Sequence, residues 1–183
     1  MRRRDLDGVS AGTRRSTILD GLRRLDWSVE ESDVPFGWPT VLQERYPPLP
    51  RAMTEFLDGL EACENPDETT WFLTRADYRP DVDTAFPWDA WERMTLEEET
   101  GTDAAEAVAF WDRHLPILLG VGSDYAYLGL EVQGGAFGPV VKGYAPGFEE
   151  TLVVAPTFDG FLELMLDALF APDPARSIES LLP

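Results

Sequence analysis

The chain has 183 residues, 44% of them hydrophobic, so it is long enough to bury a core and too apolar to be disordered throughout. Its 34 acidic residues outnumber its 15 basic residues, which gives a formal net charge of −19. This charge opposes direct binding to nucleic-acid phosphates and suits a basic protein partner, and the alternative explanation is a background compositional bias together with solubility.

The sequence contains no recognisable signal for export or for membrane insertion. No apolar run approaches the roughly 18 residues that a membrane span needs. Asp5 and Asp7 follow the arginines at positions 2–4, where an export signal would have its apolar core. The single cysteine, Cys63, excludes an intramolecular disulfide and a metal site of four thiolates. We therefore expect a cytoplasmic protein without membrane contact.

The N-terminal part is expected to hold a tail, two helices and a strand. Residues 1–15 lack apolar periodicity and predict a flexible tail. Helical spacing of apolar residues predicts an amphipathic helix over about 17–27 and, after a proline-rich segment, a second helix that begins at Pro50 and is closed by residues 65–67 (NPD). The apolar positions are Ile18, Leu22, Leu25 and Val29 in the first helix and Met53, Phe56, Leu57 and Leu60 in the second. Residues 69–74 (TTWFLT) are β-branched and aromatic, and predict a strand.

The C-terminal half predicts a helix, four strands and a closing helix. Asp103 and Glu106 have capping-box spacing before an apolar stripe, and Pro116 ends that helix near His114. Strand-like segments follow, separated by Gly, Pro or Asp, at 117–121, 125–132, 138–142 and 151–154. Thr157 is a good N-cap for a closing helix with a broad apolar face.

Together these elements predict an α+β fold. We expect a mostly antiparallel sheet of about four to six strands, flanked by helices, with the closing C-terminal helix packed on the sheet. Residues 16–171 would form this single domain, and residues 172–183 a loosely held tail.

Most patterns that could indicate chemistry have a simpler explanation. The glycine-bearing segment 120–124 is followed by a strand-like sequence instead of a helix, so it predicts a turn and not a phosphate loop. His114 has no evident catalytic partner, and acidic neighbours would raise the pKa of Cys63 and make it a poor nucleophile. Asp81 and Asp83 could approach a cation but lack a calcium-loop pattern. We predict no catalytic residue, cofactor or metal ligand.

Aromatic residues beside carboxylates provide the candidate binding surface. Phe86, Trp88 and Trp91 either fill a satellite core under a long loop or form a partner-facing patch, in which an acidic rim would attract a basic protein. Tyr125 and Tyr127 share one strand face and would extend the patch if the closing helix does not cover that face. The candidate protein-binding residues are Trp88, Asp89, Trp91, Glu97, Glu98, Asp124, Tyr125 and Tyr127.

Two short motifs resemble those of the SUKH superfamily, over roughly residues 45–170. Residues 152–162 (LVVAPTFDGFL) are similar to the usual ending of that family, a strand, Ala-x-Ser/Thr-Phe and a helix opening Phe-x-x-Phe-Leu. Residues 49–57 (LPRAMTEFL) resemble its Leu-Pro-x-x-aromatic-x-x-Phe-Leu helix entry, with Met53 at the aromatic position. The asparagine-glycine pair that commonly follows this helix is absent.

The resemblance implies a non-enzymatic binding domain. Bacterial members of the family are mostly regarded as immunity proteins that sequester toxins, often nucleases. The resulting expectation is an immunity protein that neutralises a basic, nuclease-like toxin by acidic and aromatic contacts. Because fold does not fix function, a regulatory or scaffold module without a toxin and a hydrolase with an unrecognised carboxylate site remain alternatives. The oligomeric state is not predicted.

Overall fold

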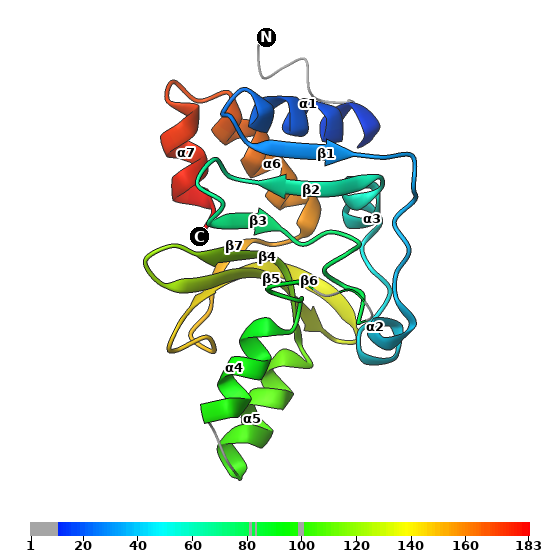
Figure 1. Ribbon diagram of the computed structural model, residues 1–183, viewed down its shortest axis with the longest axis vertical. Helices are drawn as coiled ribbons and strands as arrows, with labels where there is room; N and C mark the ends of the chain where they lie inside the picture. The colour runs from blue at the N-terminus through cyan, green and yellow to red at the C-terminus, as the bar shows by residue number, and fades with distance from the viewer. Residues whose placement is uncertain (1–10, 81, 83, 99–100) are drawn as a thin grey trace.

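The computed structural model describes residues 11–80, 82, 84–98 and 101–183, and shows an α+β fold built on an antiparallel sheet (Figure 1). The strands are β1 (Ser28–Glu31), β2 (Leu60–Glu64), β3 (Thr70–Phe72), β4 (His114–Val121), β5 (Tyr125–Gln133), β6 (Ala136–Tyr144) and β7 (Leu152–Ala155). The helices are α1 (Ala11–Arg23), α2 (Thr40–Arg45), α3 (Arg51–Leu57), α4 (Ala90–Glu98), α5 (Thr102–Trp111), α6 (Phe158–Leu169) and α7 (Pro174–Leu181).

The strands lie side by side in chain order, from β1 at one edge to β7 at the other. The expected fold class, antiparallel sheet and closing helix are confirmed. The described residues form seven strands, where about four to six were expected. The short, charged β1 lacks the apolar alternation by which a strand is recognised. Leu60 was expected to continue a helix, but Gly59, with φ of +69°, lets the chain turn into β2.

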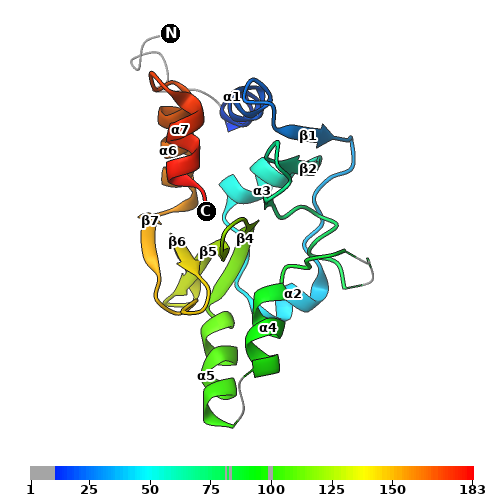
Figure 2. The same ribbon diagram turned by 60° about the vertical axis from the view of Figure 1, so that its left-hand side comes forward.

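Helices cover the sheet in two groups. Helix α6 contacts α1, α3, α7 and the strands β6 and β7. Helices α4 and α5 form a hairpin that projects from the end of the molecule opposite α1 (Figures 1 and 2). Nearly all buried apolar side chains of the described residues belong to one contiguous core. This arrangement leaves the two edge strands, β1 and β7, at opposite ends of the sheet.

Helix α6 forms where the sequence predicts it and contributes strongly to the core. The hydroxyl oxygen of Thr157 caps the helix by accepting a hydrogen bond of 3.1 Å from the backbone N–H of Gly160. Its buried residues are Phe158, Phe161, Leu162, Met165, Leu166 and Leu169. Full burial of each such side chain contributes roughly 1.5–3 kcal/mol, so this helix anchors the C-terminal half.

Part of the expected N-terminal tail is helical, because α1 begins at Ala11. Residues 1–10 of that tail lie outside the described residues. Arg14 forms an ion pair of 2.7 Å with Asp159 on α6, and Arg15 donates to the backbone carbonyl oxygens of Phe56 and Asp58. These contacts join residues far apart in the sequence, so local periodicity could not show that residues 11–15 belong to the helix.

The expectation of a loosely held C-terminal tail at residues 172–183 is wrong. Asp173 caps α7 by accepting a hydrogen bond from the backbone N–H of Arg176, and Ile178 and Leu182 are buried. The ammonium group of Lys142 on β6 donates a hydrogen bond of 2.8 Å to the carbonyl oxygen of Leu182. The C-terminal segment is therefore part of the packed structure.

Tyr127 on β5 lies across glycines of the sheet. Its hydroxyl donates a hydrogen bond of 3.1 Å to the carbonyl oxygen of Phe148, and its register partner on β6 is Gly143. A Cβ atom added at position 143 would lie 2.8 Å from the Phe148 carbonyl oxygen and would press against the Tyr127 ring. A glycine is therefore needed where the tyrosine ring crosses β6.

We expect Gly143→Ala to lower the free energy of unfolding by about 1–3 kcal/mol, because neither the buried ring nor the backbone carbonyl can move freely. Urea denaturation measures this change. Gly122→Ala is the matched control, since no atom lies within 4 Å of a Cβ placed there. Equal stability of the two variants would contradict this account of the Tyr127 packing.

Candidate protein-binding surfaces

The candidate binding residues come from two places that the fold brings together. The first place is α4 and the two residues before it, Trp88 and Asp89. The second place is the β4–β5 turn together with the start of β5. The ring centroids of Trp91 and Tyr125 are 4.8 Å apart. The indole Nε1 of Trp91 donates a hydrogen bond of 3.0 Å to the carbonyl oxygen of Ala126 on β5. The start of α4 is thus attached to β5.

Three of the candidate aromatic residues are buried and cannot contact a partner in this conformation. Trp88 is 8% exposed, and Trp91 and Tyr127 are fully buried. The Trp91 ring stacks on Phe148 at 6.2 Å, and Trp111 lies 5.1 Å from Tyr127 between ring centroids. The interpretation of these three side chains as a partner-facing patch is therefore wrong, because α4 and α5 cover this face of the sheet. The alternative given for Trp88 and Trp91, that they fill a core, agrees with their burial, but both belong to the main core and not to a satellite core under a loop.

The remaining candidates lie on α4, just before it, or at the β4–β5 turn, and are mainly acidic. We define the α4–β5 surface by Asp89, Glu97, Asp124 and Tyr125. Glu97 and Asp124 are exposed, and Tyr125 is 39% exposed. Asp89 is half-buried and forms an ion pair of 2.8 Å with Arg93. Glu98 is the last residue of α4. This surface offers carboxylates and one aromatic ring to a partner.

Arg45 at the end of α2 holds the α4–α5 hairpin to the rest of the molecule. Its Nη1 and Nη2 atoms donate to the two carboxylate oxygens of Glu92 on α4, each at 2.7 Å, and its Nε donates to Asp112 after α5 at 2.7 Å. Its guanidinium also lies 5.5 Å from the ring centroid of Tyr46 and 5.4 Å from that of Trp88. Burial is the largest single influence and lowers the pKa of Arg45, but the hydrogen bonds to Glu92 and Asp112 and the nearby negative charge together raise it above its ordinary value.

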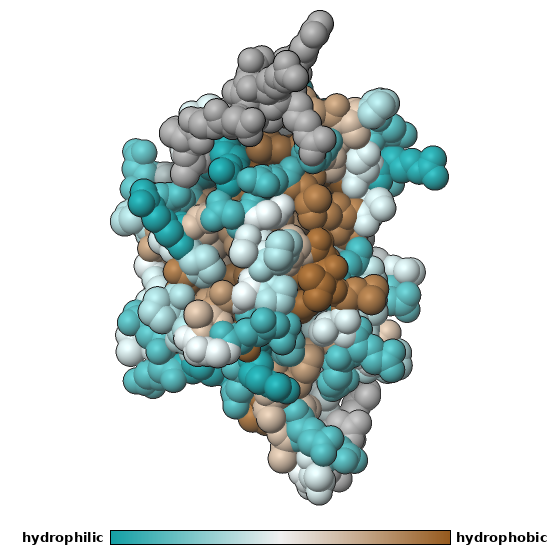
Figure 3. Space-filling model, turned by 180° about the vertical axis from the view of Figure 1, so that it is seen from behind, coloured by the Kyte–Doolittle hydropathy of each residue, from teal (hydrophilic) through white to brown (hydrophobic). Residues whose placement is uncertain are grey.

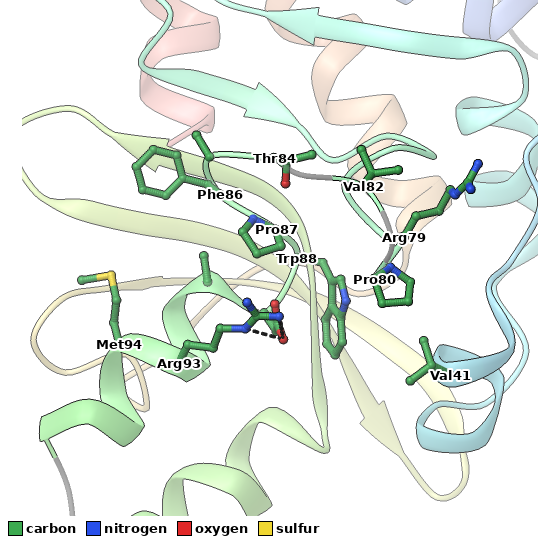
Figure 4. A pocket seen from close by; sticks show the side chains of 13 residues that line it. Val41, Arg79, Pro80, Val82, Thr84, Phe86, Pro87, Trp88, Arg93 and Met94 are labelled. Atoms are coloured by element: carbon green, nitrogen blue, oxygen red, sulfur yellow. Dashed lines mark hydrogen bonds and ion pairs between the residues drawn. The ribbon is translucent and has the colours of Figure 1, made fainter.

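A hollow of about 670 Å³ lies between α2, the loop that follows Tyr78 and the start of α4 (Figure 4). Its walls include the apolar side chains of Val41, Phe86, Trp88 and Met94. Among the described residues, Asp89 is the carboxylate that lines it. The pair considered from the sequence, Asp81 and Asp83, lies outside the described residues. The described walls could accept an apolar group and present no pair of carboxylates.

Cys63 is a buried thiol. Burial raises its pKa to about 12, so it is protonated at neutral pH. The sequence attributed this rise to acidic neighbours, whereas the structure attributes most of it to loss of solvent contact. A protonated, buried thiol is a poor nucleophile, which fits a structural role.

The sequence suggested that His114 lies at the end of the preceding helix. In the structure it is the first residue of β4. Its ring stacks on Phe110 with 3.9 Å between centroids, and its Nδ1 lies 2.8 Å from the Phe110 carbonyl oxygen. Burial lowers the pKa of His114, which favours the neutral ring at neutral pH. In this form Nδ1–H can donate to a carbonyl oxygen at the end of α5.

The glycine-bearing segment 120–124 joins two paired strands, as predicted: Gly120 and Val121 end β4, residues 122–124 form the turn, and Val121 lies opposite Tyr125. Within the described part of the chain, no group of three His, Cys, Asp or Glu side chains is arranged to hold a metal ion. None of the helices that the structure describes has the length and apolar character needed to cross a membrane.

A second candidate surface, the β7 edge, was not predicted. We define it as the outer edge of β7, Leu152–Ala155, which pairs only with β6 among the described residues. Leu152 is 65% exposed and Val153 is 68% exposed, more than any other large apolar side chain in the described part. Figure 3 shows apolar atoms gathered over β7 and α6 on the face opposite the view of Figure 1. The only sequence signal is the run Leu152-Val153-Val154, which equally describes a buried strand.

Comparison of the chain with protein-family models, with curated proteins and with solved structures gives no match. Function must therefore be argued from the α4–β5 surface, the β7 edge and the charge around them.

We expect Arg45→Met to lower the free energy of unfolding by about 3 kcal/mol, because Glu92, which is 8% exposed, would lose both hydrogen bonds from its cation. Chemical denaturation measures the loss. The control is Arg51→Met, since Arg51 is 90% exposed in its pair with Glu55 and should contribute little. If both variants lose the same small amount of unfolding free energy, Arg45 does not stabilise the position of the α4–α5 hairpin.

We expect His114 to titrate below the ordinary histidine value of 6.5 because its burial disfavours the charged ring. As pH falls through 6.5, the unfolded chain takes up the proton first, so the histidine-linked stability is present above this pH and is lost below it. NMR of the single histidine gives the pKa directly. The stability difference between wild type and His114→Gln should shrink from pH 7.5 to pH 5, and an upward-shifted pKa would contradict this prediction.

Proposed function

We propose that this chain is a non-enzymatic binding domain for a basic protein. The observation that carries the proposal is the distribution of charge. Many of the described arginines form ion pairs with carboxylates of the chain itself, while many other carboxylates remain exposed. The paired arginines are Arg14, Arg15, Arg23, Arg45, Arg51, Arg75 and Arg93. A partner therefore meets a field set mainly by carboxylates.

The α4–β5 surface is well placed to meet such a partner. Glu97 lies on the projecting α4–α5 hairpin (Figure 2), and Asp124 lies in the turn before Tyr125, whose ring centroid is 4.8 Å from that of Trp91 at the start of the hairpin. Carboxylates on a protruding element attract a basic surface from a distance and speed its association. Tyr125, 39% exposed, adds the kind of side chain that often anchors an interface. Charge would thus guide the encounter, and the tyrosine would add contact area.

We further propose that the partner is a basic, nuclease-like toxin, which the chain neutralises in the cytoplasm as an immunity protein. The support is the resemblance of residues 49–57 and 152–162 to SUKH motifs. Both segments serve the core, since the ring centroids of Phe56 on α3 and Phe158 on α6 are 6.0 Å apart. A nuclease exposes a basic substrate groove, which an acidic domain can cover. A regulatory or scaffold module is the alternative.

The test is to identify proteins that bind the purified chain at low salt, and to measure the binding of each with the purified pair. We expect a basic partner whose affinity falls steeply between about 0.05 M and 0.5 M salt, since exposed charges are screened over this range. Glu97→Gln/Asp124→Asn should lower the association rate by roughly tenfold. For an immunity protein, co-expression should also rescue cells from that partner.

The matched control is Glu30→Gln/Asp67→Asn, which removes the same charge from exposed positions on β1 and before β3. A smaller effect of this control would locate binding at the α4–β5 surface. An acidic partner, or affinity unaffected by salt, would contradict the proposed function, and salt-insensitive binding would favour the scaffold alternative.

A further inference from the structure

We propose that the β7 edge binds an extended segment of a basic partner, which joins the sheet as an additional strand antiparallel to β7. The basic character of this partner rests on the proposed function. The surface itself is separate from the α4–β5 surface, and strand addition is a distinct mode of recognition in which backbone hydrogen bonds supply much of the affinity.

The geometry of β7 leaves one side available for pairing. On its inner side the strand pairs with β6: Val141 lies opposite Val153 and Lys142 opposite Leu152, and after a register shift Val140 lies opposite Ala155. No described residue pairs with its outer side. Successive side chains point to opposite faces of a sheet, so Leu152 and Val153 expose apolar groups on both faces of this edge. An added strand could cover both.

The other edge of the sheet is protected in the usual way. Strand β1 carries Glu30 and Glu31, and Arg15 and Arg23 pair with Glu31. Charged side chains on an edge strand discourage the addition of another strand. Strand β7 has no charged residue between Leu152 and Ala155. One edge is therefore closed to strand addition and the other is open.

The charges next to β7 define the segment that fits. Glu149 and Glu150 are exposed and precede the strand, separated from Leu152 by Thr151. In an antiparallel pair, the C-terminal end of an added segment lies beside this acidic pair. The fitting segment is therefore apolar or β-branched in its centre and carries Lys or Arg at its C-terminal end. Lys142 does not compete for Glu149 and Glu150, since its ammonium donates to the carbonyl oxygen of Leu182.

A second copy of the chain fits this edge poorly. Residues 149–157 (EETLVVAPT) contain no basic residue, so a copy paired through its own β7 would leave Glu149 and Glu150 without a cation. Two chains with a formal net charge of −19 each also repel one another. Charge complementarity therefore favours a basic partner over self-association.

The test uses a fluorescein-labelled peptide, Thr-Val-Thr-Val-Thr-Val-Thr-Lys-Arg, and fluorescence anisotropy with the full chain. We expect Val153→Glu to weaken binding about tenfold or more, because a carboxylate at the edge would be desolvated by the added strand. This variant makes the chain more acidic, so general attraction for a basic peptide would rise or stay the same. Val108→Glu, at a 38% exposed valine on α5, is the matched control and should bind as wild type does.

Two altered peptides leave the protein unchanged and separate pairing from charge. A peptide N-methylated at alternate residues should lose binding, because it cannot donate hydrogen bonds to β7. A peptide with Lys-Arg moved to its N-terminus should bind more weakly if the added strand is antiparallel. Sedimentation of the free protein tests self-association through the same edge.

Loss of binding in Val153→Glu and in the N-methylated peptide, with Val108→Glu unaffected, would support the proposal. Equal binding by both variants, or no binding of the first peptide to wild type, would overturn it. A wild-type dimer that Val153→Glu dissociates would also overturn it, by showing a second copy as the occupant. None of these failures decides the proposed function, which the salt dependence and the Glu97→Gln/Asp124→Asn variant test at the other surface.

Discussion

Burial of the central strands on both faces is the constraint from which the other features of this molecule follow. Every residue of β4 from His114 to Gly120 is buried, and β5 is buried from Ala126 to Leu130. Trp111 and Phe148 contact Tyr127 on β5 and Trp91 stacks on Phe148, while α6 packs over β6 and β7. Removal of these side chains from water is a main source of stability, and it uses aromatic residues that could otherwise have served a partner.

This constraint limits where recognition can occur. With the middle of the sheet covered, a macromolecular partner can reach the loops, the projecting α4–α5 hairpin, the hollow beside α2 and the edges of the sheet. The two edges differ in kind, since β1 bears two glutamates and β7 bears only apolar side chains. The hairpin and the β7 edge combine acidic surroundings with exposed aromatic or apolar groups, which suits a partner that is basic but not uniformly polar.

Charge serves two purposes in this chain. The guanidinium groups of Arg14, Arg15 and Arg45 join elements that are distant in sequence, and each uses a carboxylate of the chain to do so. The cations are therefore partly neutralised inside the structure, and the formal net charge of −19 is expressed mainly by exposed Asp and Glu. The exterior is thus acidic because the fold uses many of its basic residues in ion pairs within the chain. This holds whether the acidic composition was selected or is background.

The sequence by itself determined the α+β class, the turn at residues 120–124 and the closing helix with its Thr157 cap, because these depend on apolar periodicity and on turn and cap chemistry within a few residues. Only the tertiary structure decided that β1 belongs to the sheet, that residues 11–15 and 174–181 are packed helix, and that Trp88, Trp91 and Tyr127 are interior. Each of these rests on contacts between distant residues, such as Arg14 with Asp159 or Lys142 with Leu182. An apolar run such as Leu152-Val153-Val154 has the same sequence whether its strand is central or at an edge, and exposure is set by the neighbours that the fold supplies.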